Sequence, residues 1–242
     1  MEVAAHVVDA RKVYGEGTTA EVVALDGVTL DLEKGRFGAI MGPSGSGKST
    51  LMHCMAGLDS LTEGSAWIGD VELGSLTDKE LTILRRDKVG FVFQAFNLVP
   101  TLTAAENIDL PVRIAGHEPD AAWRDQVIEI LDLGDRLTHR PSEMSGGQQQ
   151  RVAAARALAR KPDIVFADEP SGNLDTTSAH ELLSFLRRAV DEFGQTIVMV
   201  THDPAAASYA DRVVFLRDGL PVAELADPDA NQVLDQIKQL EA

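Results

Sequence analysis

The first forty residues alternate apolar and polar positions with the period of two that half-buried strands show. Residues 28–33 carry the clearest alternation, after an Asp26-Gly27 pair that predicts a turn. Residues 37–41 form a short apolar run that ends at a glycine-rich stretch. We therefore expect residues 3–40 to form short strands.

The middle of the chain changes from this strand pattern to a helical one. A helix is expected after Lys48, closed by Gly57 as its C-terminal cap. A small hairpin over residues 65–75 and a strand over residues 89–93 follow. Residues 97–160 are rich in Ala and Leu, which favours helices. Four prolines are expected to break these helices: Pro100, Pro111, Pro119 and Pro141.

Strands and helices then alternate in the last third of the chain. The pattern predicts a strand over 164–167, a helix over 176–193 and a strand over 196–200. Such alternation is typical of an α/β fold whose parallel strands are joined by crossover helices. Asp218-Gly219 predicts a hairpin, and the tail from Asp227 onward is predicted to be helical.

Composition narrows the classes of function. The 242 residues are 44% apolar and carry a formal net charge of −16, so a role based on nucleic-acid binding is not expected. No stretch approaches the roughly 20 apolar residues of a membrane span. The amino terminus lacks the pattern of a signal peptide. Cys54 is the single cysteine, which excludes an internal disulfide and favours the cytoplasm.

A phosphate-binding loop begins at Gly42 and ends at Lys48-Ser49. It matches the P-loop pattern and lies between a predicted strand and a predicted helix, which is the context that the motif requires. Its backbone N–H groups can surround phosphate oxygens, Lys48 can reach the β- and γ-phosphates, and Ser49 can ligate Mg²⁺. The expected ATP-binding residues here are Gly42, Pro43, Ser44, Gly45, Ser46, Gly47, Lys48, Ser49 and Thr50.

Two acids end the apolar run that starts at Ile164. Behind a P-loop, Asp168 is expected to hold Mg²⁺ and Glu169 to polarise the attacking water as a general base. Without the P-loop, two solvated acids at a strand end would be the simpler interpretation.

Several motifs of the chain resemble those of the ABC (ATP-binding cassette) ATPases. They follow one another along the chain in the same order as in that family. Met144-Ser-Gly-Gly-Gln148 resembles their signature motif, with Met where Leu is usual. The resemblance implies an ATPase with a P-loop core, an N-terminal antiparallel β subdomain and an inserted α-helical subdomain. It also assigns roles to further residues: Gln94 as a Mg²⁺ ligand and hinge, His202 as the γ-phosphate switch, Tyr14 on adenine, and Ser145, Gly146, Gly147, Gln148 and Asp175 at a partner's nucleotide.

Some of these residues have a second interpretation. Tyr14 can be a packing aromatic, and Asp175 can cap the following helix as well as contact a partner. Ser145 is a good N-cap residue, so the signature is expected at a helix N-terminus. In the family, this terminus faces ATP on a second cassette. The resemblance therefore implies a head-to-tail homodimer.

The residues around Phe96–Ile108 resemble those of the lipoprotein-release and macrolide-export branch. This implies a separate transmembrane permease, contacted through residues 95–110, and a place on the inner face of the membrane. The expected layout is a single domain: core 1–94 and 160–226, helical part about 95–159, and tail 227–242. The alternative is a mechanical regulator of cell-envelope enzymes that hydrolyses ATP without moving cargo.

Overall fold

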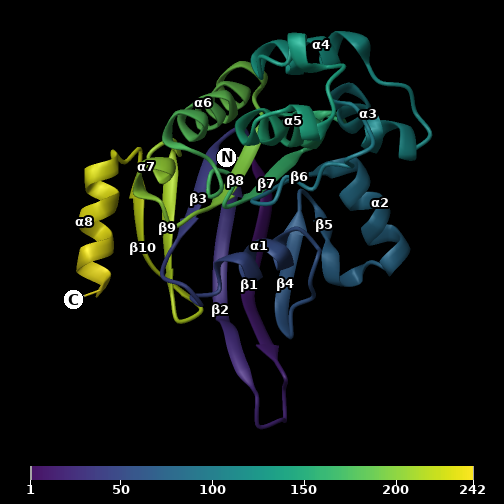
Figure 1. Ribbon diagram of the computed structural model, residues 1–242. Coiled ribbons are helices and arrows are strands. Elements are labelled where there is room, and N and C mark those ends of the chain that lie inside the picture. The colour runs from purple at the N-terminus through teal and green to yellow at the C-terminus, as the bar shows by residue number, and fades with distance from the viewer. Residues whose placement is uncertain (1, 242) are drawn as a thin grey trace.

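The larger of two β-sheets lies at the centre of the fold in the computed structural model, which describes residues 2–241 (Figure 1). Its strand order is β10-β9-β3-β8-β7-β6. Five strands run parallel, and β10 returns antiparallel to β9. The strands are β3 (Phe37–Met41), β6 (Val89–Phe93), β7 (Ile164–Asp168), β8 (Thr196–Val200), β9 (Arg212–Arg217) and β10 (Leu220–Ala226).

The smaller sheet is antiparallel, with the order β2-β1-β4-β5. It consists of β1 (Val3–Tyr14), β2 (Val22–Glu33), β4 (Glu63–Ile68) and β5 (Val71–Glu72). Helix α1 (Lys48–Met55) contacts strands of both sheets, so one hydrophobic core lies between them. Leu51 and Met52 of α1 and Phe166 of β7 are fully buried in that core.

A second core lies on the other face of the large sheet, under a layer of helices (Figure 1). This layer contains α3 (Ala104–Ile114), α4 (Ala121–Ile130), α5 (Gly146–Leu158) and α6 (Thr176–Phe193). The remaining helices are α2 (Asp78–Lys88), α7 (Pro204–Ala207) and α8 (Ala230–Glu241), with short 3₁₀ turns at 73–75, 134–136 and 141–143. The α/β class expected from the alternating pattern is confirmed.

Local sequence explains where the longest helix begins and ends. Asp175 caps α6 by accepting a hydrogen bond from Ser178 N at 3.0 Å, and Gly194 ends it at φ +65°. Leu182, Leu186 and other apolar residues are buried along one face. The predicted bounds of this helix are therefore confirmed. The predicted hairpin at Asp218-Gly219 is confirmed as well, between β9 and β10.

Four features of the structure differ from what the sequence predicts. Asp26 and Gly27 do not form a turn before a strand but lie inside β2, at a register irregularity with Gly27 at φ +92°. Pro111 does not break a helix but lies inside α3, whose buried Ile108 and Val112 supply packing that compensates the lost hydrogen bond.

The other two concern α2 and the first strands. Helix α2 was not predicted, although Thr77 and Glu80 form a capping box at its start. Its sparse apolar face hides the helical period, since Leu84 is its buried residue. The first strands are long rather than short: β1 and β2 have 12 residues each, and Tyr14 is the last residue of β1.

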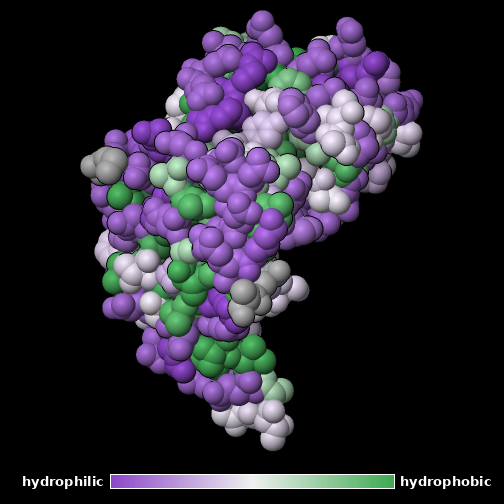
Figure 2. All heavy atoms as spheres, turned by 90° about the vertical axis from the view of Figure 1, so that its left-hand side faces the viewer, coloured by the Kyte–Doolittle hydropathy of each residue, from purple (hydrophilic) through white to green (hydrophobic). Residues whose placement is uncertain are grey.

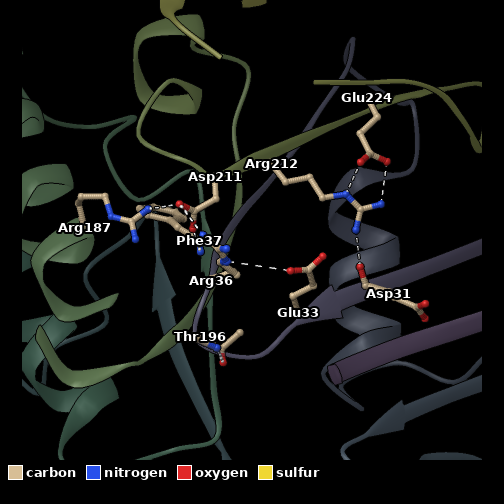
Figure 3. Close-up of polar contacts among 10 residues, drawn as sticks. Asp31, Glu33, Arg36, Phe37, Arg187, Thr196, Asp211, Arg212 and Glu224 are labelled. Atoms are coloured by element: carbon tan, nitrogen blue, oxygen red, sulfur yellow. Dashed lines mark hydrogen bonds and ion pairs between the residues drawn. The ribbon is translucent and has the colours of Figure 1, made fainter. Parts of the chain in front are cut away.

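Polar contacts tie the elements together at the amino-terminal ends of the parallel strands (Figure 3). Asp211 accepts hydrogen bonds from Phe37 N at 2.7 Å and from Arg187 Nη1 at 3.0 Å. Arg212 makes a two-point contact with Glu224 and donates to Asp31 O in the smaller sheet. A cavity of about 780 Å³ opens here, and no candidate site residue lines it. The contacts at this end of the sheet therefore stabilise the fold.

The face that carries α8 is mostly hydrophilic, with apolar side chains gathered in small areas (Figure 2). This agrees with the net charge of −16. Within residues 2–241, no helix has both the length and the apolar character needed to cross a membrane.

Candidate functional site

The phosphate loop joins the carboxyl end of β3 to the start of α1. Two of its glycines are required by the geometry. A Cβ on Gly42, at φ +149°, would run into the carbonyl of Leu216, and one on Gly47, at φ +97°, into the carbonyl of Ala24. Gly47 is also the N-cap of α1. The loop therefore presents backbone N–H groups and a helix N-terminus to an anion.

A cavity of about 610 Å³ lies over this loop, and residues from the loop, from β2 and from the ends of β7 and β8 line it. Lys48 reaches back across the loop, donating hydrogen bonds to Gly42 O at 2.9 Å and Pro43 O at 2.8 Å. Burial lowers the pKa of Lys48, against the opposing effect of Glu169 and Asp168. The lysine thus holds a compact, partly desolvated positive charge against the P-loop.

The acidic pair occupies the carboxyl end of β7, as the sequence predicts. Asp168 Oδ1 accepts a hydrogen bond of 3.3 Å from the Ser49 hydroxyl. Both groups offer the hard oxygen atoms that Mg²⁺ prefers, so their pairing fits a magnesium site. Gln94, the third predicted ligand, instead donates to Asn173 Oδ1 at 3.3 Å, and Asn173 returns a hydrogen bond to Gln94 O at 3.0 Å.

Glu169 and His202 come from adjacent strand ends and contact each other. His202 Nδ1 lies 2.7 Å from Glu169 Oε1, and Thr201 Oγ1 donates to Glu169 Oε2 at 3.4 Å. The backbone of Glu169 has φ +46°, a sparsely populated conformation for a residue with a side chain. This conformation and the two contacts aim the carboxylate at the cavity over the P-loop, which Glu169 and His202 both line.

The signature residues form the N-terminus of α5. Ser145 and Gln148 make a reciprocal capping box, with Gln148 N donating to Ser145 Oγ at 3.3 Å and Ser145 N to Gln148 Oε1 at 3.0 Å. The predicted cap is therefore confirmed. Among the described residues, those that line the cavity over the P-loop include no member of the signature. Within a single chain, the signature motif thus lies outside the cavity over the P-loop.

The Ser178 side chain lies so close to Gly147 that it leaves no room for a side chain at position 147. A Cβ there would lie 2.7 Å from Ser178 Oγ and 2.8 Å from Ser178 Cβ, at the start of α6. Ser178 is itself held by Asp175, whose Oδ2 accepts its hydroxyl at 2.7 Å. Hydrogen bonds from Ser178 lower the pKa of Asp175. The signature helix is therefore packed against the segment that follows the acidic pair.

Tyr14 lies at the end of β1 and is 42% exposed, so its ring is open to a ligand. Its hydroxyl donates to Asp59 Oδ2 at 2.7 Å, and Lys12 Nζ lies 4.9 Å from the ring centroid. Lys12 also pairs with Asp59 Oδ1 at 2.6 Å. These contacts fix the orientation of the ring, in agreement with either stacking or packing.

Three residues contribute to the site without having been predicted from the sequence. Thr201 holds Glu169, and Asn173 holds Gln94. Gln150 is fully buried on α5 and donates to Phe93 O at 2.9 Å and to Pro170 O at 2.6 Å. These contacts join the signature helix to the end of β6 and to the segment that follows β7. Only its place two residues after the signature pointed to Gln150, because long-range carbonyl partners leave no mark in a sequence.

Comparisons with known proteins agree with this geometry. Residues 25–172 match the model of the ABC transporter family. The uncharacterized ABC transporter ATP-binding protein MJ0796 of Methanocaldococcus jannaschii is 46% identical over 204 residues, 82% of this chain and 87% of that protein. The dimeric structure of MJ0796 bound to ADP and Pi superposes with a TM-score of 0.81 at 40% identity, over 93% of this chain and 99% of that one.

Two further relatives indicate the branch. The lipoprotein-releasing system ATP-binding protein LolD 1 of Chlorobium chlorochromatii is 46% identical, over 79% of each chain. The macrolide export ATP-binding/permease protein MacB of Bdellovibrio bacteriovorus is 45% identical over 87% of this chain and 32% of that protein. The chain therefore belongs to the ABC transporter family, as an ATP-binding and ATP-hydrolysing subunit of the branch that contains the LolD and MacB cassettes.

Proposed function

We propose that two copies of this chain enclose two ATP molecules head to tail, and that their closure and reopening drive a separate membrane permease. The observation that carries the proposal is the separation of the P-loop cavity from the signature residues within one chain. A two-fold arrangement would place the Ser145–Gly147 helix terminus over the partner's P-loop. The dimeric structure of the related cassette supports the formation of a dimer.

In the proposed site, Lys48 and the loop N–H groups bind the phosphates, and Ser49 and Asp168 hold Mg²⁺. The bound Mg²⁺ would neutralise charge on the β- and γ-phosphates. Glu169 accepts a proton from the attacking water, while His202 orients Glu169 and contacts the γ-phosphate. Gln94, which contacts Asn173 in this structure, would be a further residue that holds Mg²⁺, and the exposed ring of Tyr14 would stack on adenine.

Closure depends on γ-phosphate and Mg²⁺ contacts, and loss of phosphate reverses it. We infer that residues 95–159 move as a helical subdomain during this cycle. Asp175 contacts the partner copy while it caps α6. These steps use the same residues for hydrolysis and for assembly, so binding of ATP and dimerisation are one event.

The permease contact is proposed on the segment that leads into α3. Of the predicted range 95–110, residues 95–103 are exposed or half-buried, whereas Ala104, Asn107, Ile108 and Asp109 are buried against the helical core. Within the predicted range 95–110, we therefore propose residues 95–103 and the exposed Glu106 for the contact. Through it the chain would act at the inner face of a membrane. A neighbouring reading frame with four membrane helices and a large external domain would agree with this branch.

Mixing two inactive variants tests the head-to-tail site. Lys48→Ala removes the P-loop cation but leaves the signature intact, whereas Gly147→Ala alters the signature but leaves the P-loop intact. In a head-to-tail heterodimer, one composite site is fully native. We expect the mixture to regain phosphate release that neither variant shows alone. A mixture as inactive as its components would overturn the shared site.

A further inference from the structure

The segment between β6 and α3 is attached to the signature helix by a half-buried arginine. Arg156, in the last turn of α5, donates from Nη1 to Asn97 O at 2.6 Å and from Nη2 to Phe96 O at 3.1 Å. Within residues 2–241 the ion pairs include none to Arg156, and burial lowers its pKa. A charge held in this way, against backbone carbonyls alone, costs desolvation, so its position calls for an explanation.

A second contact joins the same segment to the start of the helix. The ring of Phe96 lies against Gly146, since a Cβ on Gly146 would be 3.5 Å from Phe96 Cζ. The same Cβ would lie 3.9 Å from Leu174 Cδ2, in the segment after the acidic pair. The carbonyl of Phe96 therefore contacts Arg156 in the last turn of α5, and its ring contacts the signature terminus.

The segment itself is stiffened from the other side. Asn107 of α3 is fully buried; its side chain accepts from Val99 N at 2.8 Å and donates to Val99 O at 3.1 Å and Leu102 O at 3.2 Å. Asn97 adopts φ +50°, so the chain bends at the residue whose carbonyl Arg156 holds. The segment 95–103 is thus fixed to α3 at one end and to α5 at the other.

We propose that Arg156 is a positioning residue that locks segment 95–103 to the signature helix, so that the segment and Ser145–Gly147 move as one body. Gln150 attaches the same helix to Phe93 O, at the base of the segment. A partner pressing on 95–103 would in this way shift the helix terminus that faces the second nucleotide. The transmission to a permease rests on the proposed function, whereas the attachment does not.

Hydrogen exchange of the isolated chain tests the attachment. Arg156→Met should speed exchange of the Val99 and Leu102 amides on the order of 10-fold, because two charge-assisted hydrogen bonds are lost. Arg156→Lys, which keeps the charge but not the planar fork, should give a smaller increase. The matched control is Arg113→Met, an exposed arginine on α3. Equal exchange in Arg156→Met and Arg113→Met would overturn the attachment.

Hydrogen exchange in the presence of ATP tests whether movement passes between segment 95–103 and the signature helix, and it needs no permease. In a Glu169→Gln background, ATP should change exchange in 95–103, and Arg156→Met should abolish this change although the dimer still forms. An ATP-dependent change that persists in Arg156→Met, or is missing from the parent, would overturn the proposal. If Arg156→Met does not fold, Arg156→Lys and Phe96→Ala carry the test. A permease that fails to stimulate wild-type hydrolysis would instead contradict the proposed function.

Discussion

The imidazole of His202 and the carboxylate of Glu169 are in direct contact, with 2.7 Å between Nδ1 and Oε1. The two side chains differ in accessibility: His202 is 73% exposed and Glu169 18%. Both residues line the cavity over the P-loop, and the proposed function assigns His202 the role of orienting Glu169 there.

This contact predicts the behaviour of Glu169→Gln. The amide keeps the size of the side chain but cannot accept a proton from water, so hydrolysis should fall by about 100-fold or more. ATP binding should persist, and the ATP-bound dimer should accumulate. Phosphate release and size-exclusion chromatography with ATP measure the two effects. Glu181→Gln, at an exposed position on α6, is the control. Near-native hydrolysis, or only monomer with ATP, would contradict the role of Glu169.

Lys48→Ala should act on binding instead. The ammonium group supplies the cation of the phosphate cradle, so nucleotide affinity should fall by at least about 10-fold. Titration with a fluorescent ATP analogue measures the loss. Lys79→Ala removes an exposed lysine of α2 and should bind like the wild type. Equal nucleotide affinity in both variants would show that Lys48 does not contribute to nucleotide binding.

Gly147→Ala should destabilise the fold through a specific neighbour. The added methyl group would meet Ser178 Oγ and Cβ at 2.7 and 2.8 Å, and overpacking of this kind costs about 1–3 kcal/mol. Ser178→Gly in the same chain should recover part of that loss. Urea unfolding of the four members of this double-mutant cycle gives the coupling. Gly134→Ala, where a methyl group meets nothing within 4 Å, is the control. Zero coupling between Gly147 and Ser178 would refute the clash.

Asp59 should make stability depend on pH in the acid range. Burial raises the pKa of Asp59, but hydrogen bonds from Lys12 and Tyr14 outweigh burial and lower the pKa overall. Because the folded pKa lies below the unfolded value of about 4, the stabilisation is complete above that pH. It is lost as pH falls through the folded pKa. Asp59→Asn should therefore lower Tm at pH 7, and the difference from wild type should shrink below pH 4.

The exposed Asp70 provides the comparison for Asp59. Asp70→Asn should leave Tm close to wild type at both pH values. A constant Tm difference between wild type and Asp59→Asn from pH 7 down to pH 2 would show that charge on Asp59 is not the cause.

Cys54 should be chemically silent in the folded protein. Burial raises the pKa of its thiol to about 12, and the side chain is 1% exposed. Thiolate is the reactive form, so iodoacetamide at pH 8 should modify the folded chain far more slowly than the urea-unfolded chain. Mass spectrometry follows the reaction. Equal rates in the two states would show that the α1 region opens readily.

The chain's local patterns determined most of the architecture. Elements with strong periodicity and clear end signals, such as 176–193 and the Asp218-Gly219 hairpin, were predicted at nearly their observed bounds. So were the cap at Ser145 and the P-loop between β3 and α1. Helix α2 and the position of Pro111 within α3 were not predicted. Helix α2 buries one narrow stripe, and α3 is stabilised by packing that a local pattern does not contain.

Tertiary structure decided how the motifs meet. The sequence placed Glu169 and His202 at separate strand ends, and the parallel pairing of β7 with β8 brings them into contact. The tertiary structure also places Gln94 in contact with Asn173, and Arg156 in contact with the carbonyls of Phe96 and Asn97. These partners are dozens of residues apart and several are backbone atoms, whose identity is the same for every residue. Motif and period are local properties of a sequence, whereas contacts with backbone carbonyls exist only once the chain has folded.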